Sequence, residues 1–233
     1  MQKKRTLNNL LLIKLDPEND SIKLRNGFEL YVDNTFEPEK HATVTGEIYG
    51  IPDYLYYSGM PNIGLPWKTE LEVQMGDHVI MYYLSVLNAL NVDKQNYLIE
   101  GNDKYVFIPY QNIFAVVREK TIIPINGYNL IEPSEDPDIL RQRGRMESIG
   151  MIYARLKEKS NTNVVYGIVR YVGKPNKAYV DSEYTDDGVD ISIGDTVVMK
   201  KITDIPLQYN LHAKIDDGKL YWRVQRRNIM AKL

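Results

Sequence analysis

The stretch MGDHVIMYY (75–83) decides the fold, because IGDTVVMKK (193–201) repeats its pattern half a chain later. Each stretch has an apolar residue, then Gly-Asp, then an apolar run rich in β-branched residues. A glycine takes the positive φ of a tight turn without steric cost, and an aspartate after it can bond the turn backbone. The pattern therefore predicts two turns, each followed by a strand that enters a core. The turn residues are Gly76, Asp77, Gly194 and Asp195.

Two further pairs of stretches occur in the same order along the chain. TGEIYGI (45–51) resembles YGIVRYV (166–172), and YQNIFAVV (110–117) resembles RRNIMAKL (226–233). The members of the three pairs are separated by 116 to 121 residues. Three matches in one order at nearly constant spacing predict an internal duplication, with a unit too long for a solenoid repeat. We therefore expect two tandem domains.

The boundary between the domains is expected where IFAVVREK ends and TIIPINGYNLIEP begins, which gives domains 1–119 and 120–233. Both halves consist of short runs rich in Tyr, Val and Ile, bounded by Gly, Pro, Asn and Asp, as is typical of strands. Eighteen tyrosines fit this interpretation, since aromatic residues suit pleated, half-buried surfaces. The sequence predicts an all-β protein built from two small barrels. The best helix candidate is 136–148, which starts at an aspartate but contains a glycine.

Composition restricts the chemistry that the chain can perform. The net charge is −2 over 233 residues, so the overall charge gives no attraction to nucleic acid or to a membrane surface. The chain has no cysteine, which removes disulfides, cysteine-ligated metals and thiol catalysis. No apolar run has the length of a membrane span, and the N-terminal LLLI is too short for a signal peptide. The expected location is the cytoplasm, or the host cytoplasm if the gene is viral.

The order in which these stretches occur identifies a fold more specifically than any single stretch does. Each half has an apolar first strand, a long polar loop with a glycine and an apolar triplet, a glycine-led strand, a hairpin, the Gly-Asp strand and a closing Asn-Ile strand. This order resembles the GroES co-chaperonin family, as a tandem of two such domains that covers nearly the whole chain. The resemblance implies irregular β-barrels that form a homo-oligomer. It also implies a loop in each barrel that is mobile when free and becomes ordered on a chaperonin ring.

The resemblance assigns the chaperonin contact to loops at roughly 16–40 and 133–164. The first triplet departs from the family pattern through the charge of Glu29, and the second loop has Ile149 where a second glycine would stand. An alternating strand would still put the two neighbours of Glu29 on one face. The other interpretation is that these apolar residues pack on their own barrel. The implied contact residues are Gly27, Phe28, Glu29, Leu30, Gly150, Met151, Ile152 and Tyr153.

The physical reasoning for the loops is independent of the family. Segments such as DPENDS and KEKSNTN bury too little apolar surface to become ordered by themselves. A short apolar triplet within such a loop is suited to docking into a groove of a partner. Ordering the loop costs free energy, so each contact is weak, and a ring of many copies binds through avidity. The resemblance to the GroES family implies that this partner is a GroEL-like chaperonin ring.

The stretch PDYLYYSGMPNIGLPWKTE (52–70) stands where the family forms the roof of its dome. Aromatic, loop-rich stretches are candidate interfaces. The alternative is an ordered loop that packs on its own domain. The aromatic residues of this roof or interface candidate are Tyr54, Tyr56, Tyr57 and Trp67.

Signatures of catalysis and of metal binding are missing from the sequence. The three histidines are not at ligand spacing, and HExxH, GxSxG, a Walker A loop and GxGxxG are absent. DSEYTDDGVDIS (181–192) resembles a calcium loop, but Gly194 falls where the bidentate glutamate is required. The basic clusters at 141–145 and 223–227 match no RNA-binding motif and fit a solvated edge or a subunit contact. We expect no enzymatic activity, no metal, no cofactor and no nucleic-acid or membrane partner.

Three functions follow in order of preference. The first is a co-chaperonin lid that docks on a chaperonin ring and assists ATP-dependent folding. The alternative is an oligomeric structural or assembly protein, of viral or cellular origin, that reuses the barrels without a chaperonin. Medium-chain alcohol dehydrogenases also contain GroES-like barrels, but the nucleotide-binding half and the zinc cysteines of those enzymes are missing from this sequence.

Overall fold

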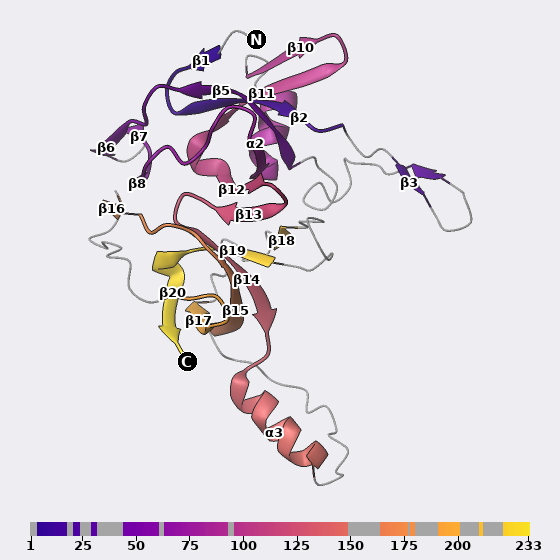
Figure 1. The fold of residues 1–233 in the computed structure, drawn as a ribbon, viewed down its shortest axis with the longest axis vertical. Helices are drawn as coiled ribbons and strands as arrows, with labels where there is room; N and C mark the ends of the chain where they lie inside the picture. The colour runs from indigo at the N-terminus through magenta and orange to yellow at the C-terminus, as the bar shows by residue number, and fades with distance from the viewer. Residues whose placement is uncertain are drawn as a thin grey trace. The chain divides into compact units, whose positions relative to one another are not determined.

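The computed structural model consists mainly of strands, which form two antiparallel sheets of eight and six strands (Figure 1). Contacts divide the chain into two compact units. The first contains Met1–Gly127 and Gly173–Gly188, and the second contains Tyr128–Val172 and Val189–Leu233. The structure describes residues 4–17, 21–23, 29–31, 44–60, 63–92, 96–148, 164–176, 178–179, 191–200, 210–211 and 221–233.

The first unit contains the eight-stranded sheet. Its path runs, in order, through β10 (Tyr97–Glu100), β11 (Asp103–Pro109), β2 (Leu10–Leu15), β5 (Thr45–Pro52), β9 (His78–Met81), β12 (Ile113–Arg118) and β13 (Thr121–Pro124). The eighth strand, β1 (Lys4–Thr6), pairs in parallel with the end of β5.

The second unit contains the six-stranded sheet. Its order is β18 (Asn210–Leu211), β19 (Tyr221–Gln225), β14 (Tyr128–Ser134), β15 (Val164–Val172), β17 (Thr196–Lys200) and β20 (Ile229–Lys232). Small two-stranded ladders complete the described strands: β3 (Ser21–Lys23) with β4 (Glu29–Tyr31), β6 (Tyr57–Met60) with β7 (Ile63–Gly64), and β8 (Trp67–Lys68) with β16 (Ala178–Tyr179).

Six strands of one sheet correspond to the six strands of the other, in the same order. The matched strands of the first sheet are β10, β11, β2, β5, β9 and β12. Their counterparts in the second sheet are, in the same order, β18, β19, β14, β15, β17 and β20. The correspondence extends to a register shift: Leu12 pairs with Gly50 and Ile13 with Ile48, just as Leu130 pairs with Tyr171 and Ile131 with Val169. We call the chain through β12 the first repeat and the chain from β13 the second repeat.

One glycine in each sheet allows two neighbouring strands to approach closely. Gly46 in β5 lies against the Lys14 carbonyl oxygen and the Ile13 side chain, so that a Cβ there would collide with both. Gly167 in β15 lies in the same way against the Glu132 carbonyl and the Ile131 side chain. These are the glycines of the matched stretches at 45–51 and 166–172. Their role is close packing between strands and not a turn.

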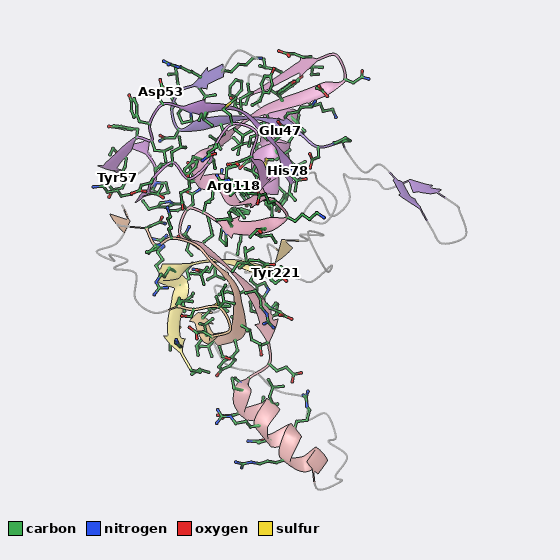
Figure 2. All side chains as sticks on the ribbon, viewed as in Figure 1. Glu47, Asp53, Tyr57, His78, Arg118 and Tyr221 are labelled. Atoms are coloured by element: carbon green, nitrogen blue, oxygen red, sulfur yellow. The ribbon has the colours of Figure 1, made fainter. Side chains whose placement is uncertain are left out.

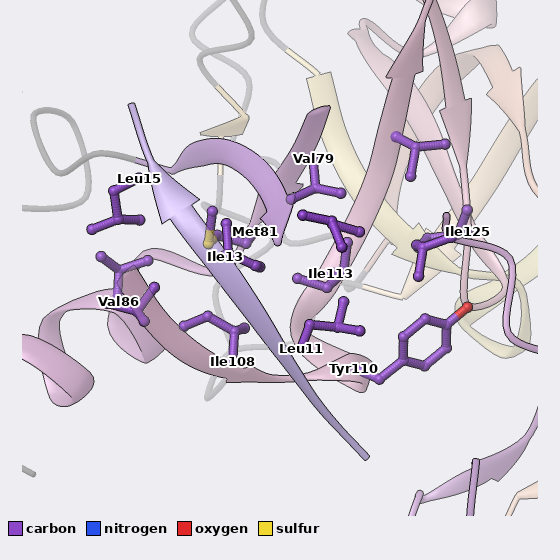
Figure 3. Close-up of a cluster of buried hydrophobic side chains, with 14 of the residues drawn as sticks. Leu11, Ile13, Leu15, Val79, Met81, Val86, Ile108, Tyr110, Ile113 and Ile125 are labelled. Atoms are coloured by element: carbon purple, nitrogen blue, oxygen red, sulfur yellow. The ribbon is translucent and has the colours of Figure 1, made fainter. Parts of the chain in front are cut away.

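Each unit buries its own apolar core. The core of the first unit contains Ile13, Ile48, Val79, Ile108 and Tyr110 among others (Figure 3). The core of the second unit is smaller and is built from Ile131, Val169, Val197, Met199 and Val224. The inward positions alternate along β5, as expected for a strand with one buried face.

Helices are few in the part of the chain that the structure describes. The helix expected at 136–148 is α3 (Pro137–Ser148), which extends away from the second sheet (Figure 1). Two short helical turns, η2 (Tyr110–Asn112) and η3 (Arg226–Asn228), precede β12 and β20. The structure supports the β-rich class that the sequence predicts. Both sheets are open among the described strands, so these strands do not form the two closed barrels that were expected.

The strand expected through HVIMYYL is shorter than predicted. β9 ends at Met81, and α2 (Tyr83–Leu87) and the π-helical η1 (Asn88–Val92) follow. The Tyr82 N–H donates to the Asn112 carbonyl at 2.8 Å, and the Ser85 N–H donates to the Tyr82 carbonyl at 3.0 Å. The first bond continues the β9–β12 pairing by one residue, and the second begins the helical turn. Apolar runs of this length do not by themselves distinguish a strand from a short helix.

Candidate functional site

The two Gly-Asp turns have the same geometry. Gly76 and Gly194 have φ of +82° and +94°. The Gln74 N–H donates to Asp77 Oδ2 at 2.7 Å, and the Ser192 N–H donates to Asp195 Oδ2 at 2.7 Å. The backbone of each turn also exchanges two hydrogen bonds with the glycine-led strand, at Ile48 in one repeat and Val169 in the other. Each turn therefore fixes the start of the Gly-Asp strand against its neighbour.

A cation on the closing strand pairs with each turn aspartate. Arg118 on β12 donates from Nε to Asp77 Oδ1 at 2.8 Å and from Nη2 to the Glu72 carbonyl at 2.9 Å. Lys232 on β20 lies 2.8 Å from Asp195 Oδ2. Burial would raise the pKa of Asp77, but the bonds from Arg118 and Gln74 hold this pKa below its ordinary value. The bonds from Lys232 and the Ser192 N–H likewise lower the pKa of Asp195.

A buried polar cluster surrounds Tyr110 in the first unit. The Tyr110 hydroxyl donates to the Glu70 carbonyl and accepts from the Glu72 N–H, both at 2.9 Å. The Asn126 side-chain amide donates to the Tyr110 and Ile113 carbonyls. The backbone N–H of Asn126 donates to the Glu72 carboxylate at 2.9 Å. Burial raises the pKa of Glu72. These polar groups bond to each other and to the backbone, which identifies the cluster as a structural element.

Side-chain contacts join the two ends of the first predicted loop, which is expected at 16–40. Asp16 follows β2 and Thr45 begins β5, and the Thr45 hydroxyl donates to the Asp16 carboxylate at 2.5 Å. His78 Nε2 lies 2.9 Å from Asp16 Oδ2. Glu47 is opposite His78 across the β5–β9 pairing (Figure 2). His78 therefore links β9 to the start of this loop.

The structure describes only part of the predicted loop residues. Glu29 and Leu30 belong to β4, where they pair with Lys23 and Ile22 of β3. Part of the second loop, expected at 133–164, is not a loop, because β14 extends to Ser134 and α3 covers Pro137–Ser148. The following residues of the two predicted contacts lie outside the described ranges: Gly27, Phe28, Gly150, Met151, Ile152 and Tyr153.

The predicted roof residues fall into two groups. Trp67 is buried in β8, which pairs with β16 inside the first unit. Tyr57 is half-buried at the start of β6 (Figure 2). Tyr54 and Tyr56 are exposed. The structure therefore places Trp67 inside its own unit and leaves the two other tyrosines available for contacts.

An exposed apolar surface next to these tyrosines was missed in the sequence. Leu7 is exposed in the turn between β1 and β2. The Tyr56 N–H donates to Asn9 Oδ1 at 2.6 Å, and Asn9 Nδ2 donates to the Tyr56 carbonyl at 2.9 Å, so the turn and the tyrosine loop are joined. The available signal was LNNL (7–10), which has the form of INGY (125–128). Asn-Gly and similar pairs indicate hairpin turns with positive φ.

Metal sites and membrane-spanning helices are both absent from the described ranges. No three histidine, aspartate or glutamate side chains gather there as a metal site would require. None of the helices described is long and apolar enough to cross a membrane. Neither a protein-family model nor a curated protein matches this chain.

Proposed function

We propose that the protein is a non-enzymatic, co-chaperonin-like lid. In this proposal, each repeat is an irregular GroES-like β-barrel, and the loops at 16–40 and 133–164 dock on a GroEL-like chaperonin ring. The lid closes the folding chamber while the chaperonin hydrolyses ATP. The expected contact residues are the glycines and triplets at 27–30 and 150–153.

The observation that carries the proposal is the position of the two long connections. The residues between β2 and β5 and those between β14 and β15 join the same pair of neighbouring strands in the two sheets. A carboxylate bonds at the base of each: Asp16 with Thr45 and His78 in the first repeat, and Asp136 with Tyr166 in the second. Two equivalent connections on equivalent strands are what a duplicated docking loop requires.

The energetics of such loops suit a lid. An apolar triplet buries a small area, and the partner must order a polar segment to bind it. Each contact is therefore weak by itself, and several copies presented together bind through effective concentration. Reversible multivalent contact allows the lid to leave once the chamber reopens.

Co-elution with a chaperonin tests the proposal. We expect the purified protein to co-elute with a chaperonin ring from its own source in the presence of ATP. The double variant Leu30→Asp, Ile152→Asp should lose this co-elution, since a carboxylate in each triplet must be desolvated on docking. Ile193→Asp serves as the matched control, because Ile193 is an exposed apolar residue outside both loops. Equal co-elution of the loop variant and the control would refute the loop assignment.

The second candidate is an oligomeric structural or assembly protein that never meets a chaperonin. The exposure of Tyr54 and Tyr56 favours it, because exposed aromatic residues mark protein interfaces, and so does the charge of Glu29. Growth of cells that lack their own co-chaperonin distinguishes the two functions. Efficient rescue by this protein would exclude the assembly function, and failure to rescue would favour it.

A further inference from the structure

Two tyrosine rings meet on the face of the first sheet that points away from its core. Tyr49 is on β5 and Tyr105 is on β11, and β2 lies between these two strands. The core residues Ile48 and Val106 are their neighbours in sequence, so alternation puts the rings on the other face. The ring centroids are 5.0 Å apart, and the ring planes are inclined at 54°. Tyr105 is 5% exposed, so packing holds its ring in place.

A β-bulge determines the position of Tyr49. On the neighbouring strand, Leu12 pairs with Gly50 and Ile13 pairs with Ile48, which makes Tyr49 the additional residue between two paired ones. A bulge changes the direction of a side chain, and bulges are frequent next to functional sites. The bulge therefore gives Tyr49 an orientation that regular pairing would not give it.

The ammonium group of Lys4 lies over both rings. Its Nζ is 4.8 Å from the Tyr49 centroid and 5.8 Å from the Tyr105 centroid, within the range of about 6 Å for a cation–π interaction. The same Nζ donates to Glu100 Oε1 at 3.1 Å. This bond raises the pKa of Lys4, so the group keeps its charge. We call Tyr49, Tyr105 and Glu100 the ammonium cage.

The second repeat has the same bulge but a different residue in it. The register shift of the second sheet falls at Arg170, between Val169 and Tyr171, so Arg170 is the equivalent of Tyr49. Arg170 donates from Nε to the Glu132 carboxylate at 2.5 Å. A guanidinium at this position repels a second cation. The duplicated scaffold therefore differs between the repeats at the residue that the ammonium cage depends on.

We propose that the ammonium cage is a binding site for the lysine side chain of a partner protein, and that Lys4 fills it in the place of this ligand. Aromatic rings around a cation are the arrangement by which proteins recognise ammonium groups. The Glu100 carboxylate adds an acceptor for the N–H groups of a primary ammonium. Lys4 shows that a lysine side chain satisfies the rings and the carboxylate at the same time.

Lys4 can leave the cage while its strand stays in place. The backbone of Lys4 pairs with that of Gly50, and this pairing does not involve the side chain. The side chains of Lys4 and Glu100 are 39% and 54% exposed, so the ammonium can rotate into solvent. Cation–π contacts and ion pairs at exposed positions are weak. Lys4 therefore acts as an internal competitor, which lowers the apparent affinity for a partner by the fraction of molecules with an open cage.

Removing the Lys4 side chain tests the site in the full-length protein. The probe is butylammonium, which has the length and charge of a lysine side chain. We expect Lys4→Ala to bind it about ten-fold more tightly than the wild type does, because the competitor is gone. Shifts of the Tyr49 and Tyr105 ring signals in NMR spectra, measured against sodium chloride at equal ionic strength, report the binding. Adding Tyr49→Leu to Lys4→Ala should abolish it.

Lys14→Ala is the matched control. Lys14 is on the same sheet, opposite Tyr105, and its side chain is 38% exposed, against 39% for Lys4. Lys14 also has its own carboxylate, since its Nζ is 2.7 Å from Asp103 Oδ2. Lys14→Ala leaves Lys4 in the cage and should bind the probe no better than the wild type. Equal affinities of the two alanine variants, or ring shifts that sodium reproduces, would overturn the proposal.

A double-mutant cycle gives a second readout that needs no ligand. Lys4→Ala should lower the urea midpoint of the wild type more than it lowers that of Tyr49→Leu, because the contact is already missing in Tyr49→Leu. Equal shifts in the two backgrounds would refute the cage, even if the protein binds a chaperonin. The cage contains no residue of the two proposed docking loops, so it holds or fails independently of the proposed function.

Discussion

Replacing Gly46 or Gly167 by alanine is expected to destabilise the protein by about 3 kcal/mol, the upper part of the usual range for overpacking. A Cβ at Gly46 would collide with the Lys14 carbonyl oxygen and would lie 2.7 Å from Ile13 Cγ2. A Cβ at Gly167 would collide with Ile131 Cγ2 and would lie 2.9 Å from the Glu132 oxygen. Because the obstacles include backbone atoms, neighbouring strands must separate to make room.

Urea unfolding followed by circular dichroism and by amide NMR signals measures this effect. Gly144→Ala is the matched control, since Gly144 lies in α3 with no heavy atom within 4 Å of an added Cβ. That change should stabilise the protein by about 0.5 to 1 kcal/mol. Unfolding midpoints of the Gly46 and Gly167 variants equal to that of the wild type would show that the strands do not approach as described.

Replacing Tyr110 by alanine is expected to cost about 4 kcal/mol, because it empties a fully buried site in the first core. Tyr110→Phe keeps the ring and removes the hydroxyl that joins Glu70 to the Glu72 N–H. Its expected cost is about 1 to 3 kcal/mol, because two hydrogen bonds are lost and the Glu70 carbonyl and the Glu72 N–H lose this partner. Denaturant titration of both variants measures the difference.

Burial of the Tyr110 hydroxyl should also make the stability of the protein depend on pH in the alkaline range. Burial raises the pKa of Tyr110 above its ordinary value, so the folded protein keeps this proton at pH values where the unfolded chain loses it. Stability therefore falls as the pH rises above about 10, the ordinary tyrosine value. The stability of Tyr110→Phe should decrease less than that of the wild type over the same pH range. An identical pH profile for wild type and Tyr110→Phe would contradict burial of the hydroxyl.

The duplicated strand order could be predicted from the sequence because its signals are local. Gly-Asp before a β-branched run marks a turn and a strand start wherever it occurs, and both copies form the same bonds at Asp77 and Asp195. The helix at 136–148 also follows from local composition. The helix after Met81 could not be predicted, because a short apolar run of this kind fits a strand as well as a helix.

The interaction surfaces could be predicted only in part. Tyr54 and Tyr56 were identified by their aromatic character, but the sequence did not show that Trp67 is buried in β8, a strand whose partner β16 lies more than a hundred residues away. Leu7 attracts no notice as a single residue, because its exposure is visible in the structure and not in the sequence.

Hydrogen exchange of the two loops, measured on the protein alone and with chaperonin plus ATP, tests the proposed function most directly. The lid proposal predicts that chaperonin slows exchange in peptides covering residues 27–30 and 150–153, while peptides of β2, β5, β14 and β15 are unchanged. The Leu30→Asp, Ile152→Asp variant should show no such protection. Exchange in both loops that is the same with and without chaperonin would contradict the proposal.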